Sequence, residues 1–198
     1  MEFQIQKQLP HSLGRAGIIK TAHGDIKTPA FMAVGTNGYV RFLSANDLHK
    51  IGTQAMLSNG YHLRRESAKI ASAGGLAHYS PLGLPDPTNP NHSAQDPAST
   101  RPDGLETTPW LSPTLTDSGG FQVMSLGSGL GKVVSMEKER GVINTAHKER
   151  LAHVSENGVS FIDPFDGQPD FIGPEESMQI QCRIGADIHM AFDELTSL

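Results

Sequence analysis

Four short runs, each predicted to be a buried strand that stops at polar residues, constrain the fold of this chain most strongly. They cover residues 30–34, 55–57, 115–117 and 187–192. The continuous apolar run over 30–34 is typical of a strand covered on both faces, as in a parallel sheet. The polar residues that follow the runs are Thr36 and Asn37, Ser58 and Asn59, Asp117 and Ser118, and Asp193 and Glu194.

Helices are expected between these strands. A capping-box-like start at Ser44 predicts a helix that ends at Gly52, and a second short helix is expected over about residues 65–73. Pro174, followed by two glutamates, marks the start of a third helix that ends at Gly185. This alternation predicts an α/β fold with a parallel sheet, either doubly wound or a barrel.

A (β/α)8 TIM-barrel type is favoured, because polar residues follow the carboxyl ends of the strands and no dinucleotide-binding glycine motif follows the first one. Residues 3–6 and 17–21 predict an N-terminal antiparallel segment that turns at 23–25. Further strand candidates are residues 132–134, 142–144 and an edge hairpin at 159–163. A whole barrel takes about 250 residues, so about four barrel strands in residues 1–198 predict only its N-terminal portion.

Residues 81–109 interrupt this pattern. Seven prolines recur among Asn, Asp, Ser and Thr, without helical or strand periodicity. Such a long aperiodic stretch is uncommon inside a compact domain. It is interpreted as an insertion, either without a role of its own or acting as a lid.

Composition excludes several classes of function. The formal net charge of −5 argues against tight non-specific binding to a polyanion, although a local basic patch is compatible with it. No apolar run approaches the ~20 residues of a membrane span, and the N-terminus lacks signal-peptide character. The single cysteine, Cys182, fits a reducing cytoplasm and cannot form a cysteine-rich zinc site. The chain is therefore expected to be cytoplasmic, without a membrane partner or a metal site of its own.

The stretch from Asp117 to Gln122 is the main candidate site. It offers an acid, the Ser118 hydroxyl, and the accessible backbone of Gly119 and Gly120 at a strand end. Phe121 and Gln122 add an aromatic face and an amide, which suit stacking on a nucleobase and hydrogen bonding to its edge. The alternatives are an Asx-capped turn for the acid and a core position for Phe121.

Asp193 and Asn59 complete the candidate site. The carboxylate of Asp193 accepts hydrogen bonds only, which suits the ring N–H and exocyclic amine of a guanine-type edge. A helix N-cap is the alternative role for Asp193. Asn59 could orient a ribose hydroxyl or cap its own turn.

Several blocks together resemble the tRNA-guanine transglycosylases, also called queuine tRNA-ribosyltransferases. The similarity extends from about residue 14 to the end of the chain, apart from the proline-rich insertion. The blocks that carry it are residues 28–36, 57–63, 117–126, 166–167, 174–181 and 185–194.

The resemblance implies a modified (β/α)8 barrel that exchanges a guanine in a tRNA anticodon for a 7-deazaguanine such as queuine or its precursor. Asp117 matches the family's acid/base aspartate, and Asp193 matches the aspartate that recognises the base. Residues 118–121 match the wall of the base pocket, and Gln122 matches a polar neighbour. A separate aspartate attacks the ribose in that mechanism and forms a covalent glycosyl-enzyme, as in a retaining glycosidase.

In the family, that nucleophile and a zinc site of three cysteines and one histidine lie beyond the position of Leu198. The 198-residue chain alone is therefore expected to lack exchange activity, and no cofactor is expected within it.

Gly60 stands where the family usually has Thr. Two alternatives stay open: a non-catalytic base- or tRNA-binding partner subunit, and a truncated product without function. The expected partners are tRNA and the base, with a homodimer or a complementary subunit as further options.

Overall fold

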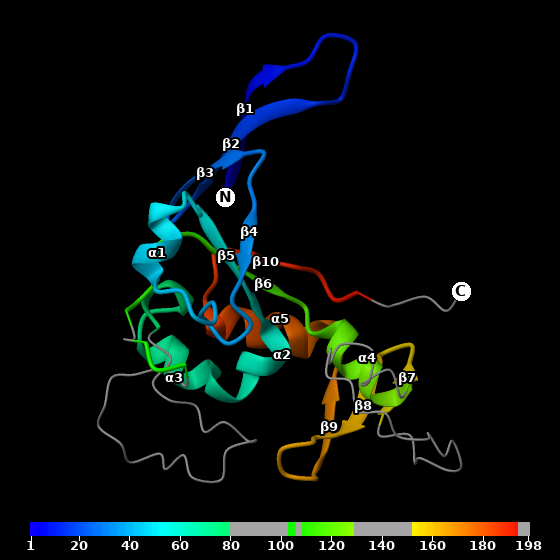
Figure 1. Cartoon of the computed structure of the whole chain (residues 1–198). Coiled ribbons are helices and arrows are strands. Elements are labelled where there is room, and N and C mark those ends of the chain that lie inside the picture. The colour runs from blue at the N-terminus through cyan, green and yellow to red at the C-terminus, as the bar shows by residue number, and fades with distance from the viewer. Residues whose placement is uncertain (80–102, 106–107, 129–151, 194–198) are drawn as a thin grey trace, which may run out of the picture.

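A parallel sheet of four strands lies at the centre of the computed structural model, which describes residues 1–79, 103–105, 108–128 and 152–193 (Figure 1). Its strands are β4 (Met32–Val34), β5 (Ala55–Asn59), β6 (Thr114–Asp117) and β10 (Ile188–His189), in the spatial order β10-β6-β5-β4. All neighbours pair in parallel. The predicted α/β class and the four predicted parallel strands are therefore present.

The two edge strands differ from the sequence-based expectations. β4 is not covered on both faces, because Phe31 is 80% and Val34 58% exposed. Only β5 pairs with it among the described residues, so β4 stands at the edge of the sheet. β10 spans two residues rather than the expected 187–192, since its partner β6 ends at Asp117 and the chain then turns into a helix.

An antiparallel sheet extends from one end of the parallel sheet (Figure 1). It is formed by β1 (Glu2–Gln8), β2 (Arg15–Thr21) and β3 (Gly24–Thr28) in sequential order. The predicted N-terminal segment and its turn at 23–25 are confirmed. The sequence analysis did not identify β3, whose alternating pattern leaves only Ile26 fully buried.

A second antiparallel sheet lies beyond the other end of the parallel sheet (Figure 1). It contains β7 (Ala152–Ser155), β8 (Gly158–Ile162) and β9 (Pro169–Ile172). The predicted hairpin at 159–163 exists, but β8 is the central strand of three rather than an edge strand. Strands predicted at 132–134 and 142–144, most of the 81–109 stretch, and Glu194 lie outside the described residues.

The helices begin and end close to the predicted signals. Ser44 and Asp47 form the expected capping box at the start of α1 (Ala45–Lys50), although Ile51 is 70% exposed rather than packed. The predicted 65–73 helix is present as a 3₁₀ turn (Arg64–Glu66) followed by α3 (Ser67–Ser72). The preceding α2 (Gly60–Leu63) was not predicted. α4 (Gly120–Ser128) follows β6 directly.

The longest helix, α5 (Pro174–Ile184), packs against the end of the parallel sheet that carries α2 and α4 (Figure 1). It ends at Gly185, which takes the left-handed conformation with φ 64°. Glycine adopts this conformation without steric strain because it has no Cβ. Its buried Ile184 joins Leu63 and Ile70 in one apolar core. A second core places Tyr61 and Val123 against the β7–β9 sheet. Within the described residues, no helix is both long and apolar enough to cross a membrane.

Candidate active site

Asp117 is the last residue of β6 and stands at the carboxyl rim of the parallel sheet. The side-chain nitrogen of Asn59 donates to Asp117 Oδ2 at 2.6 Å. The backbone N–H of Gly60 donates to Asp117 Oδ1 at 2.9 Å. Asn59 and Asp117 are register partners on adjacent strands, so sheet pairing itself brings the amide to the acid.

The environment of Asp117 favours its protonated form. Burial raises the pKa of the Asp117 carboxyl above its ordinary value, and the nearby charge of Asp193 raises it further. Hydrogen bonds from Gly60, Gly119 and Asn59 oppose this rise in pKa but do not cancel it. A carboxyl with a raised pKa can hold a proton closer to neutral pH and deliver it to a leaving group.

Asn59 has two roles in the structure. Its side-chain oxygen accepts from the backbone N–H of His62 at 3.0 Å, which caps the start of α2. Its side-chain nitrogen holds Asp117. Of the two roles considered from the sequence, the turn cap is therefore present, and the amide is already committed to the acid rather than pointing freely outward.

Asp193 reaches the same rim from the segment after β10. The hydroxyl of Ser118 donates a hydrogen bond to Asp193 Oδ1. A Cβ on Gly120 would lie 2.4 Å from the backbone oxygen of Asp193, and one on Gly119, where φ is 79°, would lie 2.9 Å from Tyr61 Cβ. Both glycines are thus required by close backbone approaches at this rim. The helix-cap alternative for Asp193 concerns residues 194–198, which lie outside the described part of the chain.

A cavity of about 480 Å³ opens at this rim. It is lined by four of the predicted site residues, Asn59, Asp117, Phe121 and Gln122. Phe121 is 41% exposed, so it is not a core residue here. The cavity is not lined by the other four predicted residues, Ser118, Gly119, Gly120 and Asp193.

Several other residues of the cavity wall had no functional role in the sequence analysis, and three of them carry aromatic rings. Tyr61, His62 and Phe165 line it together with the predicted residues. Desolvation by the surrounding chain lowers the pKa of His62, with the Arg64 charge as a smaller cause, although the residue as a whole is exposed. Tyr61 and His62 directly follow the polar end of β5, which was the available signal. Phe165 comes from the β8–β9 loop and gave no signal in the sequence.

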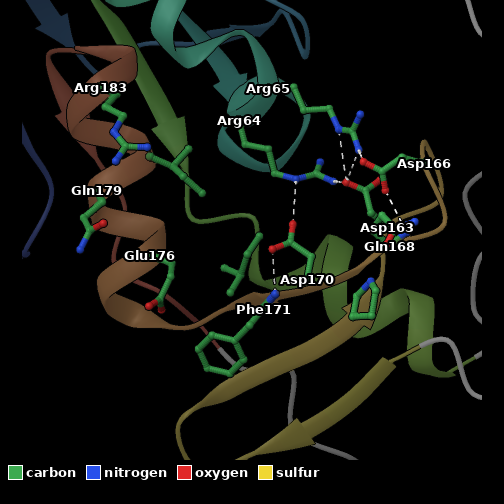
Figure 2. A pocket seen from close by; sticks show the side chains of 13 residues that line it. Arg64, Arg65, Asp163, Asp166, Gln168, Asp170, Phe171, Glu176, Gln179 and Arg183 are labelled. Carbon is green, nitrogen blue, oxygen red and sulfur yellow. Dashed lines mark hydrogen bonds and ion pairs between the residues drawn. The ribbon is translucent and has the colours of Figure 1, made fainter.

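Next to this wall, Arg64 and Arg65 gather around acidic side chains of the β8–β9 region (Figure 2). The guanidinium carbon of Arg64 lies 3.9 Å from the centroid of the Tyr61 ring. Arg64 and Arg65 both bind the carboxylate of Asp163, and Arg65 also binds Asp166. Since the Arg64 and Asp163 side chains are only 6% and 5% exposed, this ion pair fixes the β8–β9 loop against α2. A separate cavity of about 360 Å³ is lined by this cluster and by residues of α5 (Figure 2).

The zinc site implied by the resemblance does not fit these residues. It requires three cysteines, whereas the sequence contains only Cys182, which is exposed. In the part of the chain that the structure describes, no three His, Cys, Asp or Glu side chains are placed to hold a metal ion.

Comparisons with known proteins agree on one family. The sequence model of the family described as queuine tRNA-ribosyltransferase matches residues 11–198. The queuine tRNA-ribosyltransferase of Roseiflexus sp. (strain RS-1) is 36% identical over 203 residues, which cover 98% of this chain and 42% of that relative. The protein of the same name from Fusobacterium nucleatum subsp. nucleatum is 38% identical over 182 residues, covering 91% of this chain and 35% of the relative.

A third relative covers similar shares of this chain and of its own length. The queuine tRNA-ribosyltransferase of Synechococcus sp. (strain CC9902) is 34% identical over 194 residues, covering 97% of this chain and 39% of that protein. The chain thus spans about two fifths of the length of these curated relatives.

Proposed function

This chain belongs to the queuine tRNA-ribosyltransferase family, and on that premise we propose that it carries the base-exchange site of a tRNA-modifying enzyme. The reaction would replace a guanine in a tRNA anticodon by a 7-deazaguanine such as queuine or its precursor. The proposed partners are tRNA and the base, and the proposed location is the cytoplasm.

The proposed fold of the whole catalytic domain is a (β/α)8 barrel, of which these residues form a part. Four parallel strands follow one another in space in the order of the sequence, which is the arrangement that a barrel requires. The candidate residues lie at the carboxyl ends of β5 and β6 and after β10. That is the rim where barrels of this type hold their active sites.

Asp117 is proposed to act as the general acid and base of the exchange. In its protonated form it donates a proton to the departing guanine while a separate nucleophilic carboxylate, implied by the family resemblance, bonds to the ribose carbon. The carboxylate of Asp117 that results takes a proton from the incoming base as that base displaces the nucleophile. The burial that raises the pKa of Asp117 supports the first step. The hydrogen bonds from Asn59 and Gly60 keep the Asp117 carboxylate in one orientation for the second proton transfer.

Base recognition is proposed for the residues around Asp117. The carboxylate of Asp193 can accept both the ring N–H and the exocyclic amine of guanine, and the Ser118 hydroxyl holds that carboxylate in place. Phe121 offers a half-exposed ring on which a purine can stack, next to the amide of Gln122. Gly119 and Gly120 contribute indirectly, because the absence of a Cβ lets Tyr61 and Asp193 approach the main chain closely beside the cavity.

One observation carries this proposal: two acids 76 positions apart in the sequence (193 − 117) meet at one rim beside a cavity of about 480 Å³, and one of them has a raised pKa. The direct test is incorporation of labelled guanine into tRNA by the full-length protein that contains these residues. Asp117→Asn should lower the rate of incorporation by about 10²–10⁴-fold.

Asp25→Asn is the matched control, because Asp25 is an exposed carboxylate on β3. This substitution should leave the rate unchanged. Equal rates for the wild type and Asp117→Asn would remove Asp117 from the mechanism. Guanine binding without any incorporation would instead support a non-catalytic base-binding subunit. Neither binding nor incorporation would contradict the proposed function.

A further inference from the structure

Gln181 of α5 is a fully buried amide whose hydrogen-bonding capacity is all in use. Its side-chain oxygen accepts from the hydroxyl of Thr116 at 2.9 Å and from the backbone N–H of Met190 at 3.1 Å. Its nitrogen donates to Ser177 Oγ at 3.1 Å and to the backbone oxygen of Met190 at 2.9 Å. An amide has two N–H donors and two acceptor lone pairs, so every one is matched.

These four hydrogen bonds reach both segments that carry the candidate acids. Thr116 directly precedes Asp117. Ser177, which accepts from Gln181, donates in turn to the backbone oxygen of Ser118 at 2.7 Å. Met190 directly follows β10 and precedes Asp193 by three residues. A single side chain on α5 thus holds the end of β6 on one side and the segment leading to Asp193 on the other.

Regular sheet pairing alone provides little support for that second segment. β10 contains only two residues, and its last backbone link to β6 is the N–H of Met190, which donates to the oxygen of Thr116 at 3.1 Å. Gln181 bonds both the N–H and the C=O of Met190, as the next strand of a sheet would. The amide therefore continues the sheet for one residue beyond the point where β6 turns away.

We propose that Gln181, assisted by Ser177, is a positioning residue that sets the separation of the Asp117 and Asp193 carboxylates. Gln181 does not line the cavity of about 480 Å³, so it acts through the backbone and not on the base. The contribution of Gln181 to catalysis rests on the proposed function. In that function, a base bound by Asp193 must lie at a fixed distance from the Asp117 carboxyl that transfers the proton. The geometric claim itself does not depend on that function.

The test measures the electrostatic coupling between the two acids. The carboxyl of Asp117 is titrated by ¹³C NMR in the full-length protein, with and without the substitution Asp193→Asn, and the difference in pKa is the coupling. In Gln181→Leu this difference should fall to less than about half of its wild-type size, because the interaction of two charges weakens as their separation grows. A general loss of stability would not by itself change the coupling.

His23→Ala is the matched control, since His23 binds Asp187 at the opposite ends of the same strands. It should lower stability and leave the coupling at its wild-type size. Should Gln181→Leu not fold, Ser177→Ala removes the link to Ser118 and one acceptor of the Gln181 amide but keeps the bonds of Gln181 to Thr116 and Met190. It should reduce the coupling in the same direction. A coupling that is unchanged in every Gln181 and Ser177 variant that folds overturns the proposal.

Equilibrium binding of guanine to the same variants separates this inference from the proposed function. Gln181→Leu should weaken guanine binding by up to about 100-fold, the scale expected for a displacement of about 1 Å in a functional site. A reduced coupling with unchanged guanine affinity supports the positioning role and contradicts the proposed use of the two acids. Reduced affinity with unchanged coupling overturns the positioning role. If the wild type binds no guanine, the proposed function fails, and the coupling still decides the role of Gln181.

Discussion

The hydroxyl of Ser118 donates a hydrogen bond to the carboxylate of Asp193, across 75 positions of the sequence. Because Ser118 directly follows Asp117, this contact places the second acid next to the first at the carboxyl rim of the sheet. It also explains why the charge of Asp193 contributes to the raised pKa of Asp117. Two acids so arranged can bind one side of a purine and transfer a proton to it.

Asn59→Ala should raise the pKa of Asp117 further. The Asn59 amide donates to Asp117 Oδ2, and a hydrogen bond to the charged form of an acid lowers its pKa, so removing the donor has the opposite effect. The same substitution removes the cap of α2, which costs about 0.5–2 kcal/mol of unfolding free energy. Carboxyl ¹³C titration and urea unfolding measure the two effects.

Asn59→Ser separates these two roles. Serine is a good N-cap but is too short to reach Asp117 as the amide does. Most of the stability should therefore return, while the pKa of Asp117 stays raised above the wild-type value. A pKa that is unchanged in both variants would contradict the role of Asn59 in holding the acid.

Arg64→Met should be strongly destabilising, whereas Arg65→Ala should not. Loss of Arg64 leaves the buried carboxylate of Asp163 with only the partly exposed Arg65, so the cost should approach the value of about 3–5 kcal/mol for a broken buried ion pair. The Arg64 side chain is 6% exposed and that of Asp163 is 5% exposed. Arg65 also binds Asp163 but is 40% exposed, so its removal should cost no more than about 1 kcal/mol. Chemical denaturation of both variants tests the comparison, and equal losses would contradict it.

Asp187→Asn should destabilise the protein in a pH-dependent way. Burial alone would raise the pKa of Asp187, but hydrogen bonds from Thr114 and His23 outweigh it and lower the pKa below its ordinary value. A lowered folded-state pKa gives stability that is present above the unfolded pKa of about 3.9 and is lost as the pH falls through the folded value.

The difference in unfolding free energy between the wild type and Asp187→Asn should therefore be about 1–3 kcal/mol near neutral pH and shrink below about pH 4. Urea unfolding across that range provides the measurement. Asp25→Asn, on an exposed stretch of β3, should stay within about 0.5 kcal/mol of the wild type throughout. A difference for Asp187→Asn that grows as the pH falls would contradict the account.

Local signals were sufficient to predict the four parallel strands and the helices at Ser44 and Pro174. Each strand is a short apolar run, and each helix has its own cap, so neither depends on distant contacts. The edge position of β4 was not predictable, because a continuous apolar run does not reveal which neighbour covers it. The shortness of β10 likewise depends on where β6 turns into α4, which is a tertiary feature.

The candidate site was predictable in part for the same reason. Asp117 and Asn59 end adjacent strands, so a parallel sheet brings them together without further information. Phe165 was not predictable, since it reaches the cavity only because Arg64 and Arg65 bind Asp163 at the start of its loop. The role of Gln181 in joining β6 to Met190 also appears only in three dimensions, although the residue is part of a block that resembles the family.

The most direct test of the account compares the equilibrium binding of guanine and hypoxanthine, which lacks the exocyclic amine, to the wild type and to Asp193→Ala. If Asp193 accepts the amine and the ring N–H, the wild type should prefer guanine by about 10–100-fold, equivalent to roughly 1–3 kcal/mol. Asp193→Ala should bind both bases with equal affinity. The same preference for guanine in both proteins would contradict the claim that Asp117 and Asp193 form one site for a guanine-type base.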